Sequence, residues 1–188
     1  MKLIGIDPAS KKLGIVGIEY IDSSSNLTIY YDKVVESPSF FNETQRTQFM
    51  SHVVGAYLAI DKPDVVVSEK PFGIGFSAQY LKELIGGIKT SYWDKINWQG
   101  VSEARKTVLG EGFGGAKKDQ TSDWLLQYKW NKKSRKIIEE QIKLANPDTK
   151  EGYDILDAIL HVLCYLIANK HILPVTKVKG NGRKSKKT

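Results

Sequence analysis

Residues 2–20 read KLIGIDPASKKLGIVGIEY, and this stretch decides the class of fold. Two apolar runs, 2–7 and 13–20, flank a polar Pro-Ala-Ser-Lys-Lys segment, as the strands of an antiparallel hairpin do. A third run, 27–35, follows after a serine-rich turn, so the short connections predict a three-stranded antiparallel meander. The first strand ends in a carboxylate, Asp7.

Helical patterns alternate with short strand patterns in the rest of the chain. Helices are predicted over 43–60, 77–88, from about 102, and over 118–128, 132–145 and 153–169, and strands over 64–69 and 95–98. Asn42 is a candidate cap for the first helix, and the β-branched run in 64–69 suits a strand buried on both faces. A meander followed by such alternation predicts an α/β fold, a mixed sheet with helices on both faces. This architecture alone sets no function.

The composition is that of a globular domain with an appendage. The chain has 188 residues, 41% hydrophobic and 26% charged, which excludes disorder throughout and fibrous repeats. We assign residues 1–170 to one folded domain and 171–188 to a basic, disordered tail. Six basic residues fall in that tail: Lys177, Lys179, Arg183, Lys184, Lys186 and Lys187. Such a tail either binds polyanions through counterion release or only solubilises the protein.

The sequence favours an intracellular, reducing compartment. Cys164 is the single cysteine, so neither an internal disulfide nor a cysteine-rich zinc site is expected. The first apolar run is too short for a signal peptide. The most apolar stretch, 155–167, is interrupted by Asp157 and His161, so no transmembrane segment is expected.

Four carboxylates occupy positions where one site can form. Asp7 and Glu69 each end an apolar strand, and Asp154 and Asp157 are three residues apart on one face of the last helix. Carboxylates clustered in a poorly hydrated cleft repel one another unless a cation neutralises them. Hard oxygen ligands suit Mg²⁺ or Mn²⁺, so the set predicts a two-metal phosphodiester site.

Each carboxylate also has an ordinary structural role open to it. Asp7 can cap a turn, Asp154 can cap the last helix, and Glu69 can pair with Lys70 or Lys118. The prediction of a metal site therefore depends on the set and not on any one member.

Three further features are assigned to ordinary structure. His161 is close enough in sequence to Asp157 to reach a metal site, but a satisfied core histidine is the expected role. Cys164 is expected to be a small buried apolar residue. The glycines at 110, 112 and 115 spell GxGxxG without a preceding strand, which argues against a dinucleotide site and favours a flexible loop facing DNA.

The motifs resemble those of the RuvC family of Holliday-junction resolvases. Residues 4–15 are similar to the opening of that family, whose first strand ends in a metal-binding aspartate. Residues 68–72 resemble its second motif, an acid at a strand end followed three residues later by a phenylalanine. Residues 104–120 resemble its lysine-bearing stretch, and 154–158 its final helix with two acids three residues apart.

The resemblance implies an RNase H-like fold, a homodimer, and incision of four-way DNA junctions by two symmetric nicks in recombination and repair. It implies two Mg²⁺ ions per site, replaceable by Mn²⁺, with Asp7, Glu69, Asp154 and Asp157 as ligands and Lys118 as a catalytic group at the phosphate. The candidate DNA contacts are Lys70, Phe72, Arg105, Lys106, Lys117 and Lys118. Phe72 would stack on bases, worth about 1–3 kcal/mol per base, or would be a core residue.

The chain departs from the compact bacterial members between Gln120 and Asp154, where it is longer. The extra residues include 130–136, which either add a DNA contact or form the solvated face of an extra helix. This insertion and the lysine-rich tail resemble divergent phage-encoded members, whose selectivity extends to other branched DNA. The resemblance thus implies the cytoplasm of a bacterium or of a phage-infected cell.

Three other functions compete with this interpretation. Sugar kinases and actin-like ATPases open with a similar hairpin, but they need two such domains. A relative that processes structured ribosomal RNA precursors would prefer RNA. A non-catalytic protein that binds branched DNA would bind junctions without divalent-dependent cutting, which is hard to reconcile with four acids.

Overall fold

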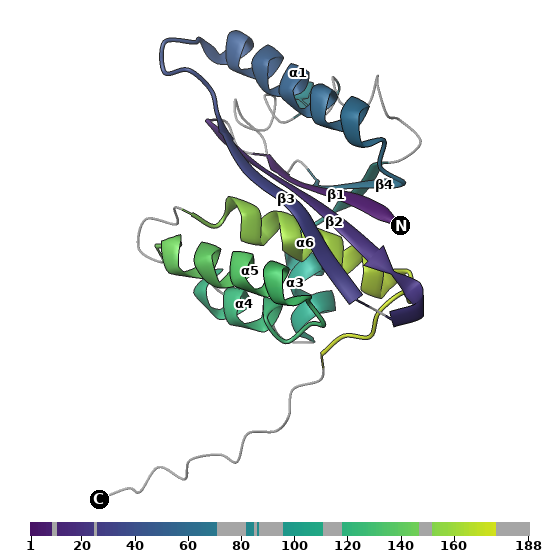
Figure 1. Ribbon diagram of the computed structural model, residues 1–188. Helices are drawn as coiled ribbons and strands as arrows, with labels where there is room; N and C mark the ends of the chain where they lie inside the picture. Colours follow the sequence, from purple (N-terminus) through teal and green to yellow (C-terminus); the bar gives the residue numbers. More distant parts are fainter. Residues whose placement is uncertain are drawn as a thin grey trace, which may run out of the picture.

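A five-stranded mixed sheet with helices on both faces forms the framework of the protein (Figure 1). The computed structural model describes residues 1–8, 11–24, 26–70, 82–84, 86, 96–110, 118–146 and 152–175, and only the backbone of 118–121. The strands are β1 (Lys2–Pro8), β2 (Lys12–Ile21), β3 (Asn26–Glu36), β4 (Val65–Glu69) and β5 (Ile96–Gln99). Their order is β3-β2-β1-β4-β5, antiparallel among β1, β2 and β3 and parallel among β1, β4 and β5. The predicted meander and mixed sheet are confirmed.

Helices cover the two faces unequally. Helix α1 (Glu43–Asp61) lies on one face, as Figure 1 shows. The other face carries α3 (Val101–Leu109), α4 (Lys118–Leu125), α5 (Lys132–Leu144) and α6 (Asp154–Ala168). Within the described residues, none of the helices has both the length and the apolar character that crossing a membrane requires.

Side chains of β1 alternate between the two cores, because successive residues of a strand point to opposite faces. Leu3 belongs to the core beneath α6, and Ile4 and Ile6 belong to the core beneath α1. All three are fully buried. The central strand is therefore covered on both faces, which explains its uninterrupted apolar run.

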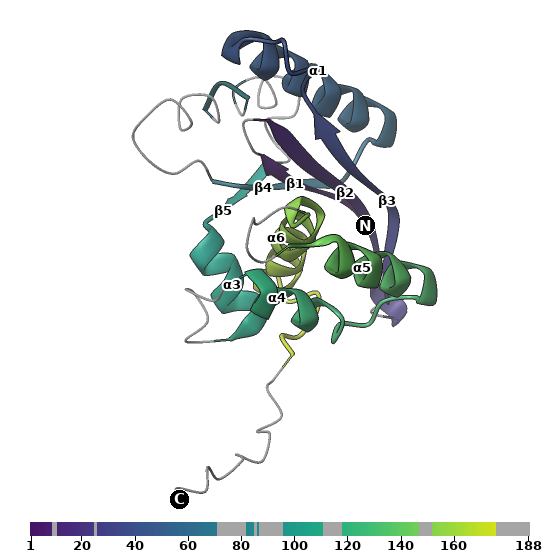
Figure 2. The same ribbon diagram turned by 90° about the vertical axis from the view of Figure 1, so that its left-hand side faces the viewer.

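Helix α6 is buried between the sheet and the helices α3, α4 and α5 (Figure 2). Its residues from Ile155 to Cys164 are all buried, as expected for a helix that is apolar on every side. Polar groups buried within such a helix lower the stability of the fold unless they have hydrogen-bond or charge partners. The two polar side chains in that run, Asp157 and His161, therefore need an explanation.

The ends of two helices illustrate the accuracy of the sequence patterns. The predicted cap is confirmed, because Asn42 and Gln45 form a capping box at the start of α1. The helix expected to reach Tyr128 ends instead at Leu125. Its predicted last turn is a tight turn, and the Tyr128 hydroxyl donates to the main-chain oxygen of Val108 at 2.9 Å.

Two predictions fall largely outside the described residues. Of the helix expected over 77–88, residues 82–84 and 86 are described and are helical. Of the tail expected from 171 onward, residues 171–175 are described, and Ile172 and Val175 pack against the core. The basic part of the tail, from 177, lies outside them.

Gly5 on β1 allows the close approach of α6 to the sheet. A Cβ at this position would collide with the main-chain oxygen of Ala158 and would lie 2.8 Å from Cγ2 of Val162. By contrast, a Cβ on Gly55 in α1 would have no heavy atom within 4 Å.

We expect Gly5→Ala to lower the free energy of unfolding by about 1–3 kcal/mol, because overpacking forces the helix and the sheet apart. The matched control, Gly55→Ala, should raise it by roughly 0.5–1 kcal/mol, as alanine does in an unobstructed helix. Urea unfolding followed by circular dichroism measures both values. Wild-type stability of Gly5→Ala would contradict this account of the packing.

Candidate metal centre

The strand register aligns four residues in one row across the sheet. Asp7 on β1 lies opposite Gly14 on β2, and Glu69 on β4 lies opposite Gln99 on β5. The parallel register of β1 and β4 pairs the preceding residues of both strands, so Asp7 and Glu69 are adjacent. The row therefore reads Gly14, Asp7, Glu69, Gln99.

This row faces α6. Gly5 is two residues before Asp7, so both residues point to the same face of the sheet, and α6 lies directly over Gly5. Glu69 is on the same face as Val65, which packs against the core beneath α6. The carboxylates at the two strand ends are thus held between the sheet and the helix.

Gly14 allows the first turn of α6 to lie beside Asp7. A Cβ on Gly14 would collide with the main-chain oxygen of Asp154 and would lie 3.0 Å from the Asp154 Cβ. Asp157, one turn farther along the helix, is only 8% exposed. Asp154 therefore lies next to the row at Gly14, and Asp157 follows on the same helix.

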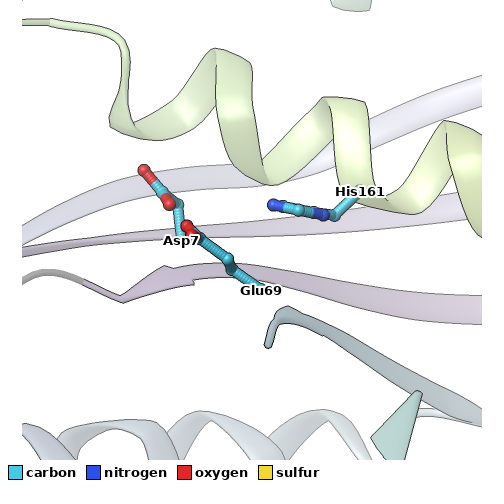
Figure 3. A group of neighbouring side chains, drawn as sticks. All are labelled: Asp7, Glu69 and His161. Carbon is cyan, nitrogen blue, oxygen red and sulfur yellow. The ribbon is translucent and has the colours of Figure 1, made fainter. Parts of the chain in front are cut away.

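Three side chains of the described part of the chain form a tight cluster. Asp7, Glu69 and His161 each offer a ligand atom, and these atoms all lie within 4.8 Å of one another. Figure 3 shows the imidazole of His161 extending from α6 toward the two carboxylates. Asp7 and His161 are buried, and Glu69 is half-buried.

The imidazole of His161 is neutral at pH 7. Burial lowers its pKa to about 4; the carboxylate of Asp157 opposes this shift, and the guanidinium of Arg105 adds to it. A neutral imidazole carries a lone pair on one ring nitrogen and can serve as a metal ligand.

The donor set fits a divalent cation. Two adjacent carboxylates in a poorly solvated site repel each other, and a cation between them removes that cost. Carboxylate oxygens suit Mg²⁺ and Mn²⁺, and an imidazole nitrogen is an additional donor for transition metals. Of the four predicted ligands, Asp7 and Glu69 belong to the tight cluster, while Asp154 and Asp157 lie on adjoining turns of α6.

Three of the six predicted DNA contacts have described side chains: Lys70, Arg105 and Lys106. Lys70 is exposed directly after Glu69, and Lys106 is exposed on α3. Arg105 lies near enough to affect His161, and its buried Nε has no hydrogen-bond partner among the described residues. Lys118 is the first residue of α4. Its side chain, together with Phe72 and Lys117, lies outside the described part of the chain.

A basic pocket at the same edge of the sheet was missed by the sequence analysis, which treated its lysines as turn residues. Strand β2 begins where β1 ends, so the start of β2 lies at the edge that carries Asp7. A cavity of about 270 Å³ there is lined by Lys11, Lys12, Glu36, Ser37, Ser39 and Arg46. Lys12 pairs with Glu36 at 2.8 Å, and Phe40 beside the pocket residues is 82% exposed. Two adjacent lysines, four and five residues after the strand-end aspartate, were the available signal.

The fold is shared with solved resolvases. RuvC of Thermus thermophilus superposes with a TM-score of 0.66 at 15% identity, covering 90% of this chain and 96% of that one. The same protein in complex with a Holliday junction substrate gives 0.64 at 13% identity, covering 90% and 96%. The fowlpox virus resolvase in complex with Holliday junction DNA gives 0.56 at 18% identity, covering 88% and 99%.

No protein-family model and no curated protein matches the chain. The structural likeness thus establishes a RuvC-like, RNase H-like fold, and this prediction of the sequence is confirmed.

We expect Mn²⁺ or Mg²⁺ to stabilise the wild-type fold, because the cation removes the repulsion between Asp7 and Glu69. At a hundredfold excess over the Kd, the gain is about 2.7 kcal/mol. Asp7→Asn should remove most of this gain and should be at least as stable as the wild type in EDTA, since a buried charge is gone.

Thermal unfolding in Mn²⁺, Mg²⁺ and EDTA measures these effects. Glu139→Gln is the matched control, because Glu139 is an acid on α5 whose side chain is 44% exposed and pairs with Arg135. This variant should keep the full gain. If the cation stabilised Asp7→Asn as much as the wild type, the cation would bind elsewhere.

Proposed function

We propose that the protein is a metal-dependent endonuclease that cuts branched DNA, above all four-way junctions. The observation that carries this proposal is the pair Asp7 and Glu69 at the ends of two adjacent parallel strands beneath α6. The second support is the RuvC-like fold, whose solved examples include two complexes with Holliday junction DNA.

The acids supply the ligands in this mechanism. Asp7 on the central strand, Glu69 and Asp157 would hold the divalent ions. When bound, the ions would supply an activated water and charge stabilisation for the leaving oxygen of a phosphodiester. Asp154 would complete the ligand set or orient the attacking water.

Cations of the chain act on the phosphate. Arg105 is half-buried, and its Nε has no hydrogen-bond partner among the described residues; its guanidinium would bind a phosphate oxygen. Lys118 would offset the charge that develops on the phosphate during hydrolysis. Lys70 and Lys106 are exposed and would bind the DNA backbone farther from the cut.

Selectivity for a branch point follows from symmetry in this proposal. A homodimer presents two identical centres at a fixed separation, which matches two symmetric nicks on a four-way junction. The basic surfaces would hold the arms through phosphate contacts, which position DNA without reading its sequence.

The full chain should nick synthetic four-way junctions symmetrically in Mg²⁺ and not in EDTA. Asp7→Asn should lower the cleavage rate by about a hundredfold or more, because it removes charge stabilisation of the transition state. Junction binding should stay near the wild-type level. Glu139→Gln is again the control and should cleave normally.

Forked duplex, linear duplex and structured RNA, tested in parallel, identify the competing functions. Equal cutting of all branched forms would mean that the enzyme selects branched DNA in general and not four-way junctions. Preferential cutting of RNA would contradict the proposed DNA substrate. Junction binding without any divalent-dependent cutting would identify a non-catalytic binder and overturn the proposal.

The basic pocket at Lys11 provides a separate test of DNA binding. Lys11→Gln should weaken junction binding at every sequence and reduce the slope of log K against log salt by about 1, as expected for one lost phosphate contact. Lys2→Gln is the charge-matched control, because Lys2 lies at the opposite end of β1. Fluorescence anisotropy across a salt series measures both slopes. An unchanged slope for Lys11→Gln would exclude this pocket from the interface.

A further inference from the structure

We propose that His161 is a direct metal ligand, which gives the centre a mixed oxygen and nitrogen donor set and a preference for Mn²⁺ over Mg²⁺. This inference rests on the proposed metal-dependent function and identifies a ligand outside the four carboxylates predicted from the sequence.

The first argument is placement. Asp154, Asp157 and His161 are at positions i, i+3 and i+7 of α6, so they form one stripe along the helix. Asp154 lies over Gly14 at one end of the row, and His161 contacts Gln99 at the other. The stripe therefore follows the row across the sheet.

The second argument is the environment of the ring. His161 is 1% exposed and lies within 4.8 Å of ligand atoms of Asp7 and Glu69. A cation between the three side chains would account for all of them, since their separations require only small side-chain movements to reach coordination.

The third argument is the partner of the second ring nitrogen. Nδ1 of His161 lies 3.4 Å from the amide oxygen of Gln99, which is 5% exposed. When Nδ1–H donates to that oxygen, the other ring nitrogen carries the lone pair. Metal-bound histidines commonly donate their other N–H in this way, which fixes the tautomer and the orientation of the ring.

In this orientation the Gln99 amide oxygen faces only acceptors and the amide nitrogen only donors, and the reversed orientation satisfies both. The reversed amide donates to the main-chain oxygen of His161 at 3.0 Å and accepts from the Tyr165 N–H at 3.1 Å. Its nitrogen then faces Nδ1, which favours a proton on the ring nitrogen that would bind the metal. Metal binding at that nitrogen would therefore have to turn the amide back, and Gln99 would then act as a positioning residue for His161.

An imidazole ligand alters the metal preference of the centre. Mg²⁺ favours oxygen donors and keeps much of its water, whereas first-row transition ions accept imidazole nitrogen readily. The Mn²⁺ affinity should therefore depend on His161, and the Mg²⁺ affinity should depend on it less.

Electron spin echo envelope modulation of the Mn²⁺-loaded full chain, without DNA, tests the ligand directly. Coordination by imidazole should give ¹⁴N modulation, which should change to the ¹⁵N pattern when the protein is labelled with ¹⁵N-histidine. The chain has three histidines. His161→Gln should abolish the nitrogen signal, whereas His52→Gln and His171→Gln should leave it intact.

Calorimetric titration measures the selectivity. We expect His161→Gln to raise the Kd for Mn²⁺ by about tenfold or more, with a smaller rise for Mg²⁺. Asp7→Asn should bind neither Mn²⁺ nor Mg²⁺. Gln99→Leu should weaken Mn²⁺ binding while His161 remains present, which separates positioning from ligation.

The outcomes distinguish this inference from the proposed function. Mn²⁺ that binds in an Asp7-dependent manner without nitrogen modulation would overturn the role of His161 and leave the carboxylate centre standing. Mn²⁺ binding that is absent, or that Asp7→Asn does not weaken, would overturn the metal centre itself. A folding defect in His161→Gln would not obscure the answer, because a nitrogen signal retained in both His52→Gln and His171→Gln assigns the ligand to His161 by elimination.

Discussion

The contact between the backbone of α6 and the strands β1 and β2 is the constraint on which the rest of the structure depends. Gly5 and Gly14 have no side chains, and the space of the missing Cβ atoms is occupied by the main chain of α6 at Ala158 and Asp154. Any larger residue would displace the helix, because packed interiors do not absorb an extra methyl group without strain. Because α6 is held at this distance, its stripe of Asp154, Asp157 and His161 lies over the row formed by Gly14, Asp7, Glu69 and Gln99.

The polar groups in this interior have a common explanation. A row that includes Asp7 and Glu69 and a helix that carries Asp157 and His161 place several ionisable groups in one poorly solvated layer. Unneutralised charges in such a layer oppose folding, so an apolar layer would be more stable. A divalent cation would convert this cost into a binding site, and the proposed hydrolysis would use the same cation. The fold and the proposed chemistry are thus linked through electrostatics.

The sequence predicted the order and type of most elements, because the alternation in β1, β2 and β3 and the cap at Asn42 are local signals. It also predicted Asp7 and Glu69 as site residues, since acids at the ends of apolar strands are conspicuous, and the structure places these two side chains close together. The sequence predicted His161 to be a core histidine. Helical periodicity shows which residues share a face of α6, but it does not show how far that face lies from β4 and β5. The end of α4 at Leu125 depends on tertiary contacts of Tyr128, which no local pattern contains.

The central claim is that α6 and the two strand ends together form a divalent-cation centre. An anomalous difference map from crystals of the full chain grown with Mn²⁺ tests this claim most directly. The account predicts a peak between the carboxylates of Asp7 and Glu69, on the side of the sheet covered by α6. A map without a peak at these carboxylates, or with Mn²⁺ held only by other residues, would contradict it.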